Sequence, residues 1–109
     1  MTEALTSLDE YLHTLNRIVT EIRRTGAIII FATTTPVAPG SVGRSNEEID
    51  AYNRAAIGMM TKKHVEVNDL NSIVKQDLAG NLCADTVHLS EQGYHNGAQE
   101  VVKHIKRHL

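Results

Sequence analysis

The chain has 109 residues, of which 41% are hydrophobic and 22% are charged, and its formal net charge is −2. This length suits one small domain rather than two, and this balance is typical of an ordinary globular protein. Without a basic surplus or an apolar run near roughly 18 residues, the sequence indicates neither a nucleic-acid partner nor a membrane span. The single cysteine, Cys83, excludes an internal disulfide, and we expect a small buried or half-buried side chain there.

The first predicted element is a helix over residues 8–24. Ser7 and Glu10 form a capping box, S-x-x-E, ahead of apolar residues spaced along one helix face. Gly26 fits the left-handed position that follows a helix end. We therefore expect an amphipathic helix that covers a sheet.

A continuous apolar run over residues 27–33 follows, and it predicts a central parallel strand covered by helices on both faces. The loop over residues 34–44 leaves the carboxyl end of this strand, where ligands bind in parallel sheets. Thr34, Thr35 and Pro36 are therefore candidates for substrate binding. Hydrogen bonding at the strand end is the alternative role of the threonines.

The remaining elements complete an α/β pattern. Ser45 and Glu48 repeat the capping box ahead of a helix over residues 46–62. A short strand over residues 64–68, a short helix from Asp69 or Asn71 and a turn at 79–81 come next. A last helix is expected over residues 90–107, with its apolar side chains buried: Tyr94, Ala98, Val101, Val102 and Ile105.

Asp85 stands three residues before His88, at the start of the last helix. In one tight turn, a carboxylate at this spacing can reach the Nδ1 side of the imidazole. That contact fixes the tautomer and leaves Nε2 to take a proton from a nucleophile, as in a hydrolase triad. A surface loop pair or a helix cap is the alternative interpretation of these two residues.

The stretch over residues 85–94 resembles the last sequence block of the SGNH hydrolases, also called GDSL esterases and lipases. Residues 26–37 resemble the fourth strand of that superfamily and its Thr-Thr-Pro loop, and residues 52–53 and 67–70 are also similar. The resemblance covers nearly the whole chain but only the C-terminal half of such a domain. It implies a partial flavodoxin-like, three-layer fold over residues 1–109, with two parallel strands and covering helices.

The resemblance implies a serine hydrolase that cleaves acyl esters of carbohydrates or lipids, with His88 as the base and Asp85 as its orienter. The Gly-Asp-Ser nucleophile block, the oxyanion glycine block and the Gly-x-Asn-Asp block are absent from the sequence. Ser41 and Ser45 are expected to be a turn residue and a helix cap. We therefore expect this chain alone to be inactive. A non-catalytic binding or assembly module derived from the same fold is the alternative.

Cofactors and metals have no clear site in the sequence. His104 and His108 have the spacing of a metal pair, but no third ligand is obvious, and histidines also suit a helix C-terminus. We expect the partner to be a second copy of the chain or a missing N-terminal half, because the edge of the strand over residues 27–33 lacks a neighbour. Residues 1–3 do not begin a signal peptide, so the cytoplasm is the default compartment.

Overall fold

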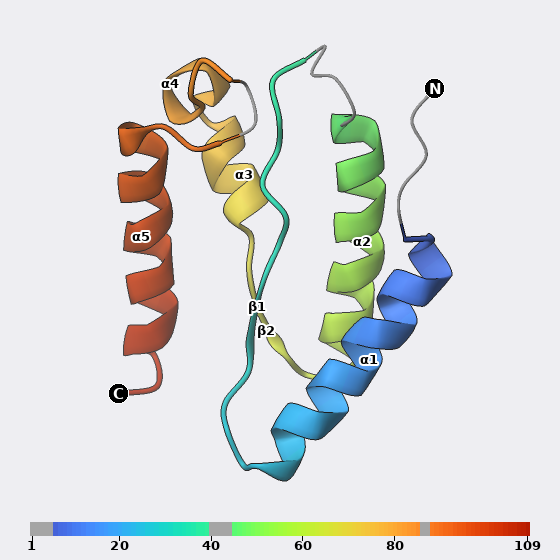
Figure 1. Ribbon diagram of the computed structural model, residues 1–109. Helices are drawn as coiled ribbons and strands as arrows, with labels where there is room; N and C mark the ends of the chain where they lie inside the picture. Colours follow the sequence, from blue (N-terminus) through green and yellow to red (C-terminus); the bar gives the residue numbers. More distant parts are fainter. Residues whose placement is uncertain (1–5, 40–44, 86–87) are drawn as a thin grey trace.

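The computed structural model describes residues 6–39, 45–85 and 88–109 (Figure 1). It is a mixed α/β structure in which helices surround a sheet of two parallel strands. The elements are α1 (Leu8–Arg24), β1 (Ile30–Ala32), α2 (Asn46–Lys62), β2 (Glu66–Asn68), α3 (Leu70–Lys75), α4 (Leu78–Asn81) and α5 (Glu91–Lys106). The α/β class predicted from the sequence is therefore confirmed.

Both long N-terminal helices begin at the predicted caps. The Ser7 hydroxyl oxygen accepts a hydrogen bond from the Glu10 amide at 3.2 Å, and the Ser45 hydroxyl oxygen accepts one from the Glu48 amide at 3.1 Å. Gly26 follows α1 with a φ of 78°, as the left-handed position requires. Within the described ranges, no helix is both long and apolar enough to cross a membrane.

The two strands lie between a layer formed by α1 and α2 and a layer formed by α5 (Figure 1). Ile30 pairs with Glu66, Phe31 with Val67 and Ala32 with Asn68. Both strands run toward the end of the molecule where α3 and α4 lie. The hydrophobic core lies on the α1–α2 side of the sheet, where Ile29 and Phe31 pack against a buried cluster of Val19, Met60 and Val65.

The first strand differs from the prediction in length and in burial. Only Ile30–Ala32 forms the strand, and none of these residues is buried. Ala27 and Ile28 are exposed as well, and Ile28 exposes 63% of its surface. The expectation of a central, buried strand was wrong, because within the described residues β1 pairs with β2 alone and forms an edge of the sheet.

Two shorter predictions also need correction. His64 is outside the second strand, because it has a φ of 58° and follows the end of α2. The predicted turn at 79–81 is part of α4, a separate short helix whose cap is Asp77. Asp69 is the cap of α3, as one of the two predicted helix starts required.

Helix α5 has nearly the predicted bounds but presents another face to the fold. Its buried residues are Gly93 and Gly97, and the His104 side chain is only 12% exposed. The apolar side chains that were expected to be buried are exposed instead: Tyr94, Ala98, Val101, Val102 and Ile105. Small and polar residues therefore face α3, α4 and β2, and the apolar stripe faces outward.

Candidate functional site

Asp85 and His88 lie in a tight loop between α4 and α5. An antiparallel bridge between Leu82 and Leu89 closes the base of this loop, and the Cys83 amide donates to the His88 carbonyl at 2.8 Å. The loop is at the end of the molecule toward which both strands run (Figure 1). This is the end where parallel α/β sheets place their ligands.

The two side chains are in contact. The Asp85 Oδ1 atom accepts a hydrogen bond from the His88 amide at 3.0 Å, and the Oδ2 atom contacts Nδ1 of the His88 ring. The His88 side chain is 72% exposed and the Asp85 side chain 47%. Asp85 can therefore hold one tautomer of an imidazole that is accessible from solvent. A carboxylate in contact with Nδ1 of an accessible imidazole also occurs between the orienter and the base of hydrolase triads.

Asn81 anchors the start of this loop. It is 1% exposed, and its side-chain amide donates to the Val74 carbonyl at 3.1 Å. Its Oδ1 atom accepts hydrogen bonds from Gln92 at 3.1 Å and from Asn96 at 3.0 Å. One buried amide thus joins α3, α4 and α5. The sequence indicated no such role, although an asparagine beside a glycine is an ordinary turn signal.

The serines of the described residues have structural partners. Ser7 and Ser45 cap α1 and α2, and the Ser72 hydroxyl donates to Oδ2 of Asp69 at 2.7 Å. The Ser90 hydroxyl donates to the Gly80 carbonyl at 2.5 Å and accepts from the Gly93 amide at 3.1 Å. Ser41 lies outside the described residues. The described serines are therefore committed to caps and turns.

Thr34, Thr35 and Pro36 lead away from the carboxyl end of β1. Pro36 is fully buried, whereas Thr34 is exposed. The Thr34 amide donates to Asn53 Oδ1 at 3.0 Å, and its carbonyl accepts hydrogen bonds from Asn53 and Asn71, at 2.9 and 3.0 Å. The two buried asparagines thus fix the backbone of this segment. The Thr34 side chain remains exposed.

Thr33 connects the two strand ends. Its hydroxyl donates to Asp69 Oδ1 at 2.9 Å and accepts from the Asn71 amide at 3.0 Å. Burial raises the pKa of Asp69, but hydrogen bonds from Ser72 and Thr33 outweigh that effect and lower the pKa below its usual value. An ionised Asp69 therefore holds the turn after β2 against the end of β1.

Cys83 differs from its prediction, because its thiol is exposed rather than buried. The thiol donates a hydrogen bond to the Leu89 carbonyl at 3.1 Å. The bridge at the base of the loop holds Cys83 directly across from His88. The apolar character of cysteine suggested burial, but Cys83 lies on the surface of a two-stranded turn.

A second cluster of titratable side chains lies at the opposite end of the strands. His108 Nε2 donates to Glu66 Oε1 at 2.7 Å, and His104 Nδ1 donates to Oε2 at 2.5 Å. These hydrogen bonds hold the pKa of Glu66 below its usual value of 4.5. Arg107 adds an ion pair at 3.6 Å. The two histidines with metal-pair spacing thus attach α5 to β2 through a carboxylate.

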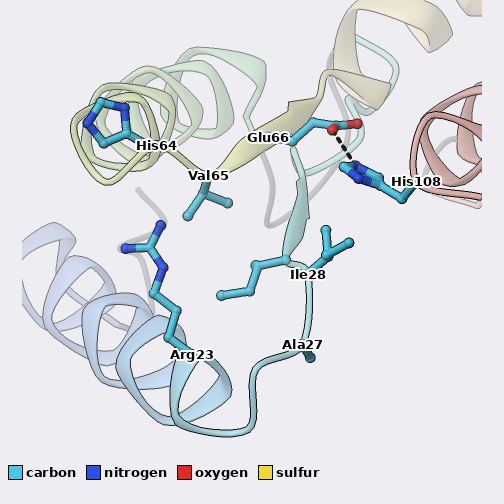
Figure 2. Close-up of a pocket in the computed structure, with 8 residues that line it drawn as sticks. Arg23, Ala27, Ile28, His64, Val65, Glu66 and His108 are labelled. Atoms are coloured by element: carbon cyan, nitrogen blue, oxygen red, sulfur yellow. Dashed lines mark hydrogen bonds and ion pairs between the residues drawn. The ribbon is translucent and has the colours of Figure 1, made fainter.

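Glu66 and His108 also line an open cavity of about 300 Å³ (Figure 2). The rest of its lining is Arg23, Ala27, Ile28, Ile29, His64 and Val65. Among the described residues, no group of three histidine, cysteine or carboxylate side chains is placed to hold a metal ion. The cavity thus has a mixed lining of four apolar residues and four charged or polar ones, and it lies at the other end of the strands from Asp85 and His88.

No family model matches this chain, and a search of curated proteins found no match either.

Proposed function

We propose that this chain is the C-terminal portion of an SGNH-type ester hydrolase, with His88 as the general base and Asp85 as its orienter. The contact between Asp85 Oδ2 and His88 Nδ1, at the carboxyl end of two parallel strands, carries the proposal. The substrate class is an acyl ester of a carbohydrate or lipid. The serine nucleophile and the oxyanion donors come from an N-terminal half.

Each half of the proposed enzyme contributes different catalytic groups. In the complete site, His88 takes the proton from the serine and then gives it to the leaving alcohol. Asp85 keeps the ring oriented through Nδ1. Loss of a triad nucleophile costs roughly a millionfold in kcat, and loss of one oxyanion donor costs about a hundred- to a thousandfold. The chain alone should therefore not turn over esters.

The first test measures hydrolysis of 4-nitrophenyl acetate by the chain alone. Exposed imidazoles attack this ester slowly by themselves, so His95, an exposed histidine of α5, provides the matched control. We expect His88→Ala and His95→Ala to leave the same small background. A rate that only His88→Ala removes would contradict the expected inactivity, and Ser41→Ala and Cys83→Ala would then locate the nucleophile.

The second test restores the missing part. The N-terminal half of a GDSL esterase, with its Gly-Asp-Ser block, is fused ahead of residue 6, and folding is checked by NMR. We expect activity that falls at least about ten-thousandfold with His88→Ala and not with His95→Ala. A folded fusion that labels with a fluorophosphonate but is insensitive to His88→Ala refutes the assigned role.

An assembly module derived from this fold is the second candidate. The observation that favours it is the exposed apolar stripe of α5 together with the free edge of β1. Such a module would bind its partner through these surfaces and would remain inactive in the assembled state. The fusion experiment therefore distinguishes the two functions.

A further inference from the structure

The free edge of β1 consists of residues that a folded chain would normally cover. The run over residues 27–32 is entirely apolar, yet the strand contains no buried residue and Ile28 is 63% exposed. An unpaired apolar edge is a template for another strand. It carries none of the charges, prolines or bulges that usually protect such edges.

The register of the sheet identifies the backbone groups that are available. The Thr33 amide donates to the Asn68 carbonyl at 3.1 Å, so residue 33 faces β2. Backbone groups alternate along a strand, and residue 31 therefore faces β2 as well. Ile30 and Ala32 direct their amide and carbonyl groups to the open edge, and Ile28 does so where the extended chain continues.

The side chains of the same residues also point to the less covered face. Ile29 and Phe31 pack into the core on the α1–α2 side. Because side chains alternate, Ile28, Ile30 and Ala32 point to the side of α5. That helix packs mainly against α3, α4 and β2, and it leaves Val101, Val102 and Ile105 39–48% exposed. The molecule thus exposes both an apolar strand face and an apolar helix stripe.

The exposed apolar side chains agree with a missing cover. Ile28 exposes 63% of its surface, Val102 and Ile105 expose 48% each and Val101 exposes 39%. A standard protein–protein interface buries roughly 800 Å² on each partner. One further partner of similar size is therefore sufficient to cover these residues.

We propose that a second copy of this chain occupies the β1 edge, with the two β1 strands antiparallel about a twofold axis that passes between the two Ile30 residues. In this register Ile30 faces Ile30 of the other copy, and the large, exposed Ile28 faces the small, exposed Ala32. All these residues direct backbone groups to the open edge, so each facing pair exchanges two backbone hydrogen bonds.

A second copy fits this edge for three reasons. The large side chain of each strand faces the small one of the other, so the same sequence is complementary to itself. The axis is perpendicular to the joined sheet, which places both α5 helices and their exposed valines on the same face. The net charge of −2 produces little repulsion between copies. The inference does not depend on the hydrolase proposal, although an N-terminal half would compete for the same edge.

Light scattering coupled to size-exclusion chromatography tests the proposal at about 10 to 200 µM chain. We expect a dimer whose dissociation constant rises about a hundredfold or more in Ile28→Lys, because the charge is buried without a partner. Gly58→Lys is the control: it adds the same charge at an exposed site of α2 where nothing lies within 4 Å of an added Cβ. It should leave the dimer intact.

The register has its own test. Ala32→Glu alone should also dissociate the dimer, whereas the double variant Ile28→Lys/Ala32→Glu should restore it, because positions 28 and 32 face each other across the axis. Both positions are exposed in the single chain, so circular dichroism should show that all variants remain folded. Restoration by the double variant supports the antiparallel pairing in particular.

Three outcomes overturn the proposal. A chain that stays monomeric over the whole concentration range assigns the edge to a strand of another protein, such as an N-terminal half. A dimer that is insensitive to both single variants lies elsewhere on the surface. A dimer that both single variants dissociate and the double variant does not restore has a different register.

Discussion

Gly93 sits where the first turn of α5 passes over the end of α4. A Cβ atom at this position would lie 2.2 Å from the Asn81 carbonyl oxygen and 3.0 Å from its carbon. The same carbonyl accepts the Ser90 amide at 2.8 Å, so the backbone cannot simply move aside. Gly93→Ala should therefore displace the start of α5 and strain the loop that carries His88.

The magnitude follows from three contributions. Overpacking at a close backbone contact costs about 1–3 kcal/mol. Weakening of the Ser90 hydrogen bond adds about 1 kcal/mol. The better helix propensity of alanine returns about 1 kcal/mol. We expect a net loss of about 2 kcal/mol for Gly93→Ala. The same substitution at Gly58, where an added Cβ has nothing within 4 Å, should instead stabilise the fold by about 0.5–1 kcal/mol.

Thermal unfolding followed by circular dichroism compares the two variants with the wild-type chain. For a domain of this size we expect Tm to fall by about 8 °C for Gly93→Ala and to rise by about 3 °C for Gly58→Ala. Hydrogen exchange at the Ser90 amide should become faster only in Gly93→Ala. Equal Tm changes of the same sign in both variants would refute the reasoning, because the close contact between position 93 and the Asn81 carbonyl would then have no effect on stability.

Two further predictions concern the titratable pairs. Hydrogen bonds from His104 and His108 hold the pKa of Glu66 below its usual 4.5. The ionised carboxylate of Glu66 therefore stabilises the fold at pH values above the unfolded-state pKa. This contribution is lost as the pH falls through the lower folded-state pKa. The Tm difference between wild type and Glu66→Gln should therefore shrink as the pH is lowered from about 5 to 3, and a constant difference would contradict it. At the other site, ¹⁵N NMR should show neutral His88 mainly as the Nδ1–H tautomer, and Asp85→Asn should remove this preference while His95 stays unchanged.

Local signals predicted the helices well. The capping boxes at Ser7 and Ser45 set the starts of α1 and α2, because a cap depends on residues three positions apart. The contact between Asp85 and His88 could be predicted for the same reason, since one turn brings residues three positions apart together. These features need no knowledge of the rest of the fold.

Features that depend on distant parts of the chain could not be predicted from local sequence patterns. The spacing of apolar residues in α5 predicted a helix, but it could not show that Gly93 and His104 would face the fold while Val102 and Ile105 face outward. A periodic apolar stripe indicates that a helix needs a cover and does not identify the cover. The apolar run over residues 27–33 led to the wrong prediction of a buried strand for the same reason, because a sequence suited to a buried strand forms an edge strand here.

Asp85 and His88 make the contact that the proposed function requires, but their surroundings differ from those of a catalytic base. Both side chains are largely open to water, where the attraction between a carboxylate and an imidazole is weak and orientation is easily lost. Triad chemistry depends on a site from which water is excluded and in which the dipoles are fixed in advance. A partner that covers the carboxyl end of the strands would supply this environment together with the nucleophile. A partner that pairs only with the β1 edge and leaves the loop exposed would make the chain an assembly module. The exposure of His88 in the assembled state, measured by its reaction with diethyl pyrocarbonate, therefore separates the two functions: protection of His88 relative to exposed His95 supports the hydrolase, and equal reactivity of the two supports the module.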